Sequence, residues 1–468
     1  MKKNLIFLSA IAFMAAFISC TEPVDPQPGP DEQDQQEQPE KLEAFKVSVP
    51  VTDNWVWDIK PSITIEVENP NAVAAEASVI VTIKTDKGTS VEVVEFTDEI
   101  PAKGKKILTV TTINNLDPGF YRAICQVNKK YVGNFIFGIS PYDIVSAPDM
   151  RSDFDEYWEN AKNSLPVLVE GETVILTELP SSNSYANKVY LVEMQSAPNS
   201  PDGDPVIVRG FYVEPQDGQK HPVIMHFFGW DDRGGSVTVP SGGSGSYAEF
   251  YLSTRGQYHN NRAASHDKET WTLADPCTYA SILNPNDKYN WFGFNFGDKD
   301  GFYYRGAFLD CVQAVRFMAS RPTSDMTNLF AEGSSQGGAL SYACAALSDY
   351  PFTAIACNVA FLGDYPDYFD IVSWPGNVAK ENQGTMSDEE MYAFLSYYDT
   401  KNLATRISCA VLASSGLQDG TCPPHTNFAA FNNLNTTDKE MIIDPKMGHS
   451  YPSGWSTKLS NFFKDRIK

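Results

Sequence analysis

The 468-residue chain lacks the residue patterns that bind structural metals, cradle phosphates or attract nucleic acids. None of its eight cysteines forms a C-x-x-C pair or a Cys/His spacing typical of a metal site, so we expect no metal. The glycine-rich segment 242–246 has no lysine after it, so it does not predict a phosphate-binding loop, and no cofactor is expected. With 36 basic against 59 acidic residues, the charge of −23 argues against a nucleic-acid partner.

The apolar run near the N-terminus is shorter than the roughly 20 residues that a membrane-spanning helix needs. Lys2 and Lys3 precede this run, which covers 5–18, and Cys20 follows it closely. The pattern indicates a signal peptide over 1–20 whose lipobox-like cysteine becomes a lipidated N-terminus, as in bacterial lipoproteins. An ordinary signal peptide with an incidental cysteine is the alternative. We therefore expect a secreted protein anchored to a bacterial membrane through Cys20, in the periplasm or at the cell surface.

Two regions of different composition follow the signal. Residues 21–40 are rich in proline, glutamine and acidic residues, which predicts a disordered tether because almost nothing there could build a core. Between about 41 and 140, hydrophobic residues alternate with polar ones, as at 63–67 and 79–83, and turn sequences separate the runs. This pattern predicts a small all-β immunoglobulin-like sandwich. Trp55 and Trp57, two apart on an expected strand, favour a core or interdomain contact, with sugar stacking as the alternative.

Over 141–468, segments with the period of a helix alternate with short apolar runs typical of strands. Phe154, Trp158 and Leu165 recur on one helical face, and Asp153 is spaced from Glu156 as in a helix cap. Short apolar runs that predict strands alternate with further helical stripes up to a closing helix near the C-terminus. The alternation predicts an α/β domain, with a mostly parallel sheet and helices on both faces.

Residues 332–338, Glu-Gly-Ser-Ser-Gln-Gly-Gly, follow an apolar run and precede a small-residue helical stretch. This is the strand, turn and helix of a G-x-S-x-G nucleophile elbow. Gly333 and Gly337 allow the tight turn that presents Ser335 above a sheet edge. The backbone N–H of Gln336 then points to where an oxyanion would form.

A serine hydroxyl needs a histidine to take its proton and a carboxylate to orient that histidine. Asp419 and His449 each follow a strand-like run, and with Ser335 they give the order Ser, Asp, His that is typical of α/β-hydrolases. His425 is the other histidine after the serine. It stands close behind Asp419, where Pro423 and Pro424 indicate a helix N-terminus, so we interpret it as a pocket or helix-start residue.

From about Asp143 to its end, the chain resembles the acetyl xylan esterase and cephalosporin C deacetylase family of α/β-hydrolases. Several separate segments carry the likeness: the family's opening helix, its R-G-Q motif, the helix before the elbow strand, the G-x-S-Q-G-G elbow and the G-L-x-D-x-x-C-P-P segment. In this chain they are Asp153–Trp158, Arg255-Gly256-Gln257, Tyr303–Arg305 with Asp310, Gly333–Gly338, and Gly416–Asp419 with Cys422–Pro424.

The resemblance implies Ser335 as nucleophile, His449 as general base and then acid, and Asp419 as the orienting carboxylate. It also implies a second oxyanion donor in the loop 228–230, where the family more often has His-Gly-Tyr. Trp230, the last residue of this loop, is the candidate donor. Its N–H can serve although the family more often has tyrosine there, because a backbone donor does not depend on the side chain.

Other motif residues and departures concern the surroundings of the nucleophile. Arg255 of the R-G-Q motif, with Gly256 and Gln257, is expected to support the elbow loop rather than touch substrate. Ser450 follows the histidine where the family commonly has glutamate. The segment 258–302, which contains Trp271 and Trp291, resembles the family only faintly and is expected to form part of the rim.

These features predict a lipid-anchored carboxylic ester hydrolase that removes small acyl groups, mainly acetyl, from an acetylated polysaccharide or oligosaccharide. One alternative is cleavage of a feruloyl or cephalosporin-type ester on the same fold. The other is an inactive carbohydrate-binding surface lipoprotein that works through its β-sandwich. The resemblance also raises a ring-like oligomer, but the additional N-terminal domain and the anchor leave the oligomeric state open.

Overall fold

The computed structural model describes residues 42–179, 187–200, 202–230, 237–238, 240–242, 245–255, 259–260 and 291–468. Contacts between residues group Ala44–Lys468 into one compact unit, distinct from Met1–Glu43. The expected signal peptide and tether therefore lie outside the described residues. Among the described helices, none combines the length and apolar character that a bilayer crossing requires.

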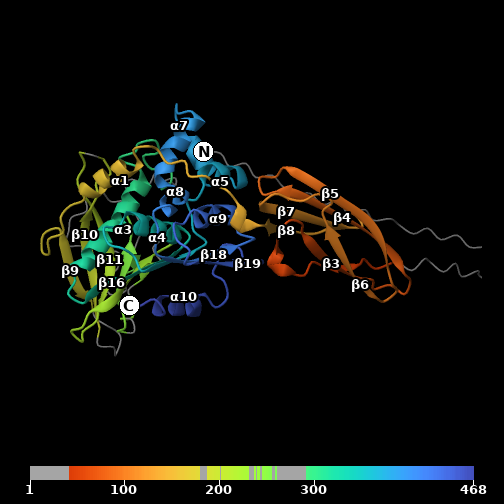
Figure 1. Cartoon of the computed structure of the whole chain (residues 1–468), viewed down its shortest axis with the longest axis horizontal. Coiled ribbons are helices and arrows are strands. Elements are labelled where there is room, and N and C mark those ends of the chain that lie inside the picture. The colour runs from red at the N-terminus through yellow and green to blue at the C-terminus, as the bar shows by residue number, and fades with distance from the viewer. Residues whose placement is uncertain are drawn as a thin grey trace, which may run out of the picture. The chain divides into compact units, whose positions relative to one another are not determined.

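The β-rich region, residues 46–139, consists of two sheets (Figure 1). The first sheet has the strand order β1-β3-β6 and the second has the order β2-β8-β7-β4-β5. Neighbouring strands are antiparallel except β2 and β8, which are parallel. The strands are β1 (Lys46–Ser48), β2 (Val56–Trp57), β3 (Ser62–Glu68), β4 (Ala75–Thr85), β5 (Ser90–Ile100), β6 (Lys105–Thr111), β7 (Gly119–Val127) and β8 (Lys130–Ile139).

The alternation predicted for this region is confirmed by burial, because the inward residues of β3 and β4 are fully buried. They are Ile63, Ile65, Val67, Val79, Val81 and Ile83. Trp55 ends a short 3₁₀ turn, η1 (Asp53–Trp55), so the prediction that both tryptophans share a strand was wrong. Asn54 has a left-handed φ of 52°, which breaks the extended backbone. Trp55 stacks on Phe135 at 4.1 Å between ring centroids, and Trp57 meets the edge of Phe137 at 5.7 Å, so both rings pack inside the region.

The remainder of the unit is built on a nine-stranded sheet with the order β19-β18-β17-β16-β12-β14-β11-β10-β9. From β19 to β14 the neighbours are parallel, whereas β14, β11, β10 and β9 pair antiparallel, which makes the sheet mixed. Its strands are β9 (Val174–Leu179), β10 (Lys188–Ser196), β11 (Val206–Glu214), β12 (His221–Phe227), β14 (Ala248–Ser253), β16 (Ser324–Ser334), β17 (Ala354–Asn358), β18 (Ala410–Gly416) and β19 (Lys439–Asp444). A two-residue pair, β13 (Val237–Thr238) and β15 (His259–Asn260), stands apart.

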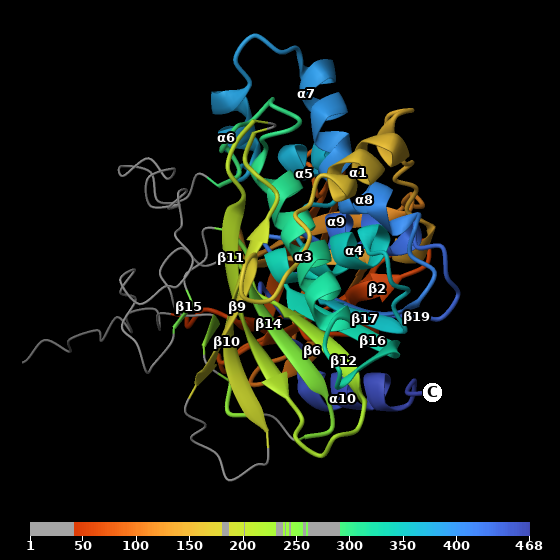
Figure 2. The same ribbon diagram turned by 90° about the vertical axis from the view of Figure 1, so that its left-hand side faces the viewer.

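Helices cover both faces of this sheet, as Figures 1 and 2 show. Along β16, Leu329 and Ala331 face the main core with α3 and α4, whereas Phe330 packs on Phe463 of α10 on the opposite face. This alternation is the two-residue period of a strand buried on both sides. The helices are α1 (Phe154–Asn163), α3 (Tyr303–Ala319), α4 (Gln336–Leu347), α5 (Tyr365–Ile371), α6 (Gly376–Asn382), α7 (Asp388–Leu395), α8 (Thr400–Ala404), α9 (Pro424–Asn432) and α10 (Trp455–Lys464), with 3₁₀ turns η2 (Pro141–Asp143) and η4 (Ser396–Tyr398).

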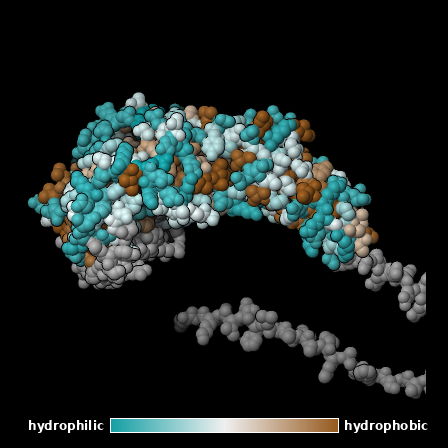
Figure 3. Space-filling view, turned by 60° about the horizontal axis from the view of Figure 1, so that its bottom comes forward, coloured by the Kyte–Doolittle hydropathy of each residue, from teal (hydrophilic) through white to brown (hydrophobic). Residues whose placement is uncertain are grey.

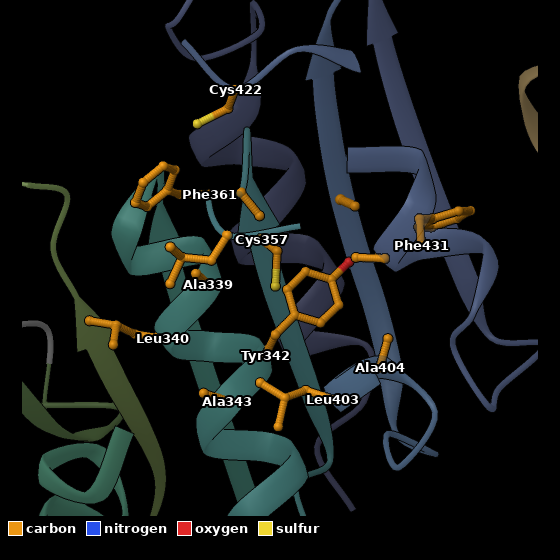
Figure 4. Packing of buried hydrophobic residues seen from close by; sticks show 14 of the residues in the cluster. Ala339, Leu340, Tyr342, Ala343, Cys357, Phe361, Leu403, Ala404, Cys422 and Phe431 are labelled. Atoms are coloured by element: carbon orange, nitrogen blue, oxygen red, sulfur yellow. The ribbon is translucent and has the colours of Figure 1, made fainter. Parts of the chain in front are cut away.

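Helix α4, which follows the elbow, is fully enclosed over most of its length. The ring of Tyr342 on α4 lies among Cys357 of β17 and Leu403 and Ala404 of α8 (Figure 4). Small residues on the same helix, such as Ala339 and Ala343, let it approach its neighbours closely. The elbow is therefore mounted on a rigid part of the core.

Helix α1 begins at Phe154, but the predicted cap by Asp153 is absent. The Asp153 carboxylate instead accepts hydrogen bonds from Lys299 Nζ at 3.1 Å and from the Tyr397 hydroxyl. The attraction between the Lys299 ammonium and the carboxylate, together with the Tyr397 hydroxyl, turns Asp153 away from the helix N-terminus. On the face seen in Figure 3, hydrophobic residues form small groups among hydrophilic ones, as expected for a chain with 59 acidic and 36 basic residues.

Candidate active site

The elbow joins β16 directly to α4, with Ser335 at the turn. Ser335 has φ 59° and ψ −121°, a conformation that a non-glycine residue adopts only when its surroundings enforce it. Its N–H donates to Asn358 O at 2.9 Å, and its carbonyl accepts from Phe361 N–H at 3.0 Å. Hydrogen bonds on both sides therefore hold the strained residue in place.

The two flanking glycines are required by space. A Cβ at Gly333 would lie 2.2 Å from the carbonyl carbon of Gly337, and a Cβ at Gly337 would lie 2.2 Å from Phe227 O. Both distances are far below any real contact and involve backbone atoms, which cannot move aside. Strand β12, the elbow and α4 thus touch backbone to backbone, which is why both positions need glycine.

The structure brings Ser335, His449 and Asp419 together in a linear relay. His449 Nε2 lies 2.9 Å from Ser335 Oγ, and His449 Nδ1 lies 2.8 Å from Asp419 Oδ2. The other oxygen of Asp419 accepts the N–H groups of Thr421 at 2.8 Å and Cys422 at 2.9 Å. The Asp419 side chain is fully buried, whereas 31% of the His449 side chain is exposed. With its Nδ1–H held by Asp419, the imidazole presents the Nε2 lone pair to the serine hydroxyl.

One residue that the sequence did not single out, Asn358, connects the elbow to the histidine loop. Its Nδ2 donates to Ser334 Oγ at 2.6 Å and to Ser450 O at 3.1 Å, and Ser414 Oγ donates to its Oδ1 at 2.5 Å. Asn358 is the last residue of β17, a short apolar strand, and this position at a strand end was the only sign in the sequence that it could lie near the site. Asn358 thus links Ser334 and Ser450, the chain neighbours of Ser335 and His449, and helps to set the distance between these two residues.

The two candidate oxyanion donors lie on either side of Ser335. Gln336 is the first residue of α4, where backbone N–H groups are unpaired and the helix dipole is positive. Trp230 follows Gly229, and a Cβ on that glycine would lie only 3.7 Å from Ser335 Cβ. The loop after β12 therefore passes directly beside the nucleophile.

The Trp230 side chain belongs to an aromatic cluster. Its ring lies 4.6 Å from that of Trp291 and meets Trp374 nearly perpendicularly at 5.7 Å. Trp291 in turn stacks on Tyr303 at 5.2 Å and is fully buried. Of the expected rim segment 258–302, residues 259–260 and 291–302 are described, whereas Tyr258 and Trp271 lie outside the described residues.

Arg255 is buried and bound on every side. Its Nε and Nη2 donate to the two oxygens of Asp310 at 2.9 and 2.7 Å, and Nη1 donates to Asn199 Oδ1 at 2.8 Å. A Cβ on Gly306 of α3 would lie 2.0 Å from Nη1, so the helix approaches the guanidinium closely. These contacts tie the end of β14 to α3. Gly256 and Gln257 lie outside the described residues.

His226, which also escaped the sequence analysis, lies between two carboxylates next to the elbow. Its Nδ1 is 2.7 Å from Glu332 and its Nε2 is 3.1 Å from Glu249, while its ring stacks on Tyr251 at 4.1 Å. Burial alone would lower the pKa of His226, but the two carboxylates outweigh burial and raise the pKa to about 9. The histidine is therefore charged at neutral pH and bridges β12, β14 and β16 just before Gly333.

His425, the other histidine after the nucleophile, is paired with carboxylates elsewhere. Its Nδ1 lies 2.9 Å from Asp86 and its Nε2 lies 2.9 Å from Asp367. Against the opposing effect of burial, these carboxylates raise the pKa of His425 to about 9, so it cannot accept a proton from serine at neutral pH.

Asp364, Asp367 and His425 lie close enough together to suggest a metal site. Lys87 Nζ, however, binds Asp367 at 2.5 Å and Lys401 Nζ binds Asp364 at 3.0 Å. Lysine and protonated histidine already balance the two carboxylates. The group is therefore better described as an ion-pair network than as a metal site.

Comparisons with known proteins bear on the family and the fold of the chain. The model of a family described as acetyl xylan esterase (AXE1) matches residues 142–466. A curated relative, acetyl esterase Axe7A of Xylanibacter ruminicola, is 27% identical over 367 residues, which cover 77% of this chain and 75% of that protein. The solved acetyl xylan esterase from Paenibacillus sp. R4 is 26% identical with a TM-score of 0.56, covering 70% of this chain and 98% of that one. Acetyl xylan esterase 1 from Thermoanaerobacterium sp. JW/SL YS485 gives 24% identity, a TM-score of 0.55 and the same two coverages.

Proposed function

The chain belongs to the acetyl xylan esterase family and is a carboxylic ester hydrolase with an α/β-hydrolase fold, and from that premise we propose its substrate and its catalytic residues. The substrate is an acetylated plant-type polysaccharide or oligosaccharide, and the catalytic residues are Ser335, His449 and Asp419. The observation that carries the residue assignment is the pair of contacts made by His449, at 2.9 Å to Ser335 Oγ and 2.8 Å to Asp419 Oδ2.

In the first half of the reaction, Ser335 Oγ attacks the carbonyl carbon of the acetyl ester while its proton passes to His449 Nε2. The carbonyl oxygen becomes an oxyanion, which accepts hydrogen bonds from the backbone N–H groups of Gln336 and Trp230. The tetrahedral intermediate collapses when His449 returns the proton to the departing sugar oxygen. The sugar leaves with a free hydroxyl, and the acetyl group stays on Ser335.

In the second half, water attacks the acetyl-enzyme and His449 takes the proton of that water. A second tetrahedral intermediate forms at the same oxyanion donors. Its collapse returns the proton to Ser335 Oγ and releases acetate. Asp419 holds the imidazole in place through His449 Nδ1 and stabilises the imidazolium that forms twice in each turnover.

The experiment that tests this assignment compares two substitutions in the full chain on p-nitrophenyl acetate. Ser335→Ala is expected to abolish turnover without unfolding the protein, because the elbow backbone is held by its own hydrogen bonds. His221→Asn is the control, since His221 pairs with the exposed Asp217 at the start of β12 and is expected to leave turnover unchanged. Undiminished turnover in Ser335→Ala would refute the role of Ser335.

The acyl preference is tested on matched oligosaccharides that carry either acetyl or feruloyl esters. We expect release of acetate to exceed release of ferulate, as the match to the acetyl xylan esterase family supports. Faster release of ferulate would favour the alternative ester chemistry. The alternative of an inactive binding protein is disfavoured by the hydrogen-bonded relay at Ser335.

We further propose two features that rest on sequence patterns. Cys20 is lipidated and anchors the protein to a bacterial membrane, which predicts that Cys20→Ala moves it from the membrane fraction to the soluble fraction. The β-rich region is immunoglobulin-like, as its two sheets of mainly antiparallel strands around a shared core support.

A further inference from the structure

The side chain of Gln418, the residue before Asp419, connects the β-rich region to the loops of the active site. Its Oε1 accepts the N–H of Ile136 on β8 at 2.9 Å. Its Nε2 donates to the carbonyl of the same Ile136 at 3.0 Å and to Pro445 O at 2.8 Å. The acceptor and both hydrogens of the amide are thus used at once.

The site on β8 is an open strand edge. Strand β7 pairs with β8 on one side, Arg122 lying opposite Ile136. On the other side β2 pairs with Gly138 and Ile139, and no strand of the described residues pairs with Ile136 there. The Gln418 amide pairs with the N–H and C=O of Ile136 as a peptide group of an added strand would. A carboxamide can make this pairing, whereas a carboxylate has no donor for the carbonyl and a hydroxyl has only one hydrogen.

Gln418 also lies between the two loops that complete the triad. Its backbone N–H donates to Met447 O at 3.0 Å, and its amide holds Pro445, so both contacts fall on the loop that carries His449. Just before it, a Cβ on Gly416 would lie 2.4 Å from Met447 O. The loop of the acid and the loop of the base are therefore packed against each other at Gln418.

The far end of the acid loop is bound to the same β-rich region. His425, at the start of α9, pairs with Asp86 in the turn between β4 and β5 at 2.9 Å. One helical turn further, Phe428 packs on Phe120 of β7 with 5.5 Å between ring centroids. The loop that carries Asp419 therefore contacts the β-rich region at both of its ends, through Gln418 before Asp419 and through His425 after it.

We propose that Gln418 is a positioning residue of the triad, and that through it the β-rich region fixes the loops of Asp419 and His449 in their reactive geometry. The inference rests on the proposed function, since it assigns a task to that same site. It gives the β-rich region a part in turnover in addition to any part in binding carbohydrate.

The test compares two substitutions of similar volume in the full chain. Gln418→Met removes the three amide hydrogen bonds. Asn432→Leu is the matched control, because Asn432 Nδ2 donates to Pro141 O and Ile144 O, each at 3.0 Å, at the other end of α9. That control breaks comparable amide-to-backbone contacts without touching either triad loop.

We expect Gln418→Met to lower kcat on p-nitrophenyl acetate by roughly 10- to 100-fold, with KM changed less than about threefold, because small misplacement of a reacting group has effects of this size. Asn432→Leu is expected to keep kcat within about twofold, and both variants to melt a few degrees below wild type. Unchanged kcat in Gln418→Met, or equal losses of kcat in both variants, would overturn the proposal.

A double-mutant cycle separates positioning from general destabilisation. In an Asp419→Asn background the imidazole has lost its orienting partner, so adding Gln418→Met is expected to lower kcat by less than about threefold. If Gln418→Met lowers kcat as much in that background as in the wild-type background, its effect does not act through the triad, and the proposal is overturned. If Gln418→Met does not fold, Gln418→Glu enters the same cycle, because it keeps the acceptor for Ile136 N–H. An inactive wild-type protein would instead refute the proposed function itself, which keeps the two failures distinct.

Discussion

Replacement of His425 by asparagine is expected to weaken the protein at pH 6 far more than at pH 9.5. His425 is held between Asp86 and Asp367, each at 2.9 Å, and its pKa is raised to about 9 from the ordinary value of 6.5. A histidine whose pKa is raised on folding contributes stability that is fully present below the unfolded pKa and is lost as the pH rises through the folded pKa. The window for His425 therefore extends from about pH 6.5 to about pH 9.

The magnitude follows from the same two pKa values. A difference of about 2.5 units corresponds to roughly 3 kcal/mol in the free energy of unfolding at 1.36 kcal/mol per unit. For a folded unit of this size, an unfolding entropy near 2 cal/mol/K per residue converts that energy into a shift in Tm of roughly 3 °C. His226, whose pKa is also raised to about 9, is present in both proteins, so its own titration cancels in the difference.

The assay is thermal unfolding of wild type, His425→Asn and His221→Asn at pH 6 and pH 9.5, followed by circular dichroism. The Tm deficit of His425→Asn is expected to shrink by roughly 3 °C between the two pH values, whereas His221→Asn serves as the histidine control at the exposed Asp217. A Tm deficit of equal size at both pH values would refute the reasoning, because it would mean that the charge of His425 does not stabilise the contacts with Asp86 and Asp367.

Three further substitutions probe the scaffold of the site. Gly337→Ala places a Cβ 2.2 Å from Phe227 O, so we expect loss of esterase activity on p-nitrophenyl acetate and a clear drop in Tm; a stable, active variant would contradict the backbone contact. Arg255→Lys replaces a paired contact with Asp310 by a point charge inside a buried site, and we expect a loss of about 2–4 kcal/mol in guanidinium unfolding. Asp310→Asn is the matching change on the other partner, and a wild-type unfolding curve in either variant would count against the support role of the pair.

The sequence brought forward the proposed reacting groups more readily than the groups that hold them. Ser335, Asp419 and His449 each follow a recognisable strand, and the order of their types limits the choices to few, so local pattern was sufficient to select the three side chains that the structure joins by hydrogen bonds. Gln418 and Asn358 have no pattern of their own. Their importance comes from contacts with Ile136 and with Ser450, residues far away in the sequence, and such pairings arise only when the chain folds.

Local reasoning also failed where tertiary contacts compete with it. Asp153 has the spacing of a helix cap, yet Lys299 and Tyr397 take its carboxylate. Trp55 and Trp57 were assigned to one strand, but the left-handed Asn54 turns the chain just before Trp55. The parallel part of the sheet was anticipated from the alternation of strands with helices. The antiparallel pairing of β10 and β11 was not, because β11 is buried over almost its whole length and its apolar run resembles that of a parallel strand.

The near-contact of Gly416 with the backbone at Met447 has a consequence for redesign and for divergence within the family. Two segments that meet main chain to main chain cannot change length separately, so an insertion in one demands a compensating change in the other. We expect the acid and base segments to be exchangeable between homologues only as a matched set. Attempts to widen the range of esters accepted should instead vary the side chains of the loop 228–230 after β12, which passes beside the nucleophile.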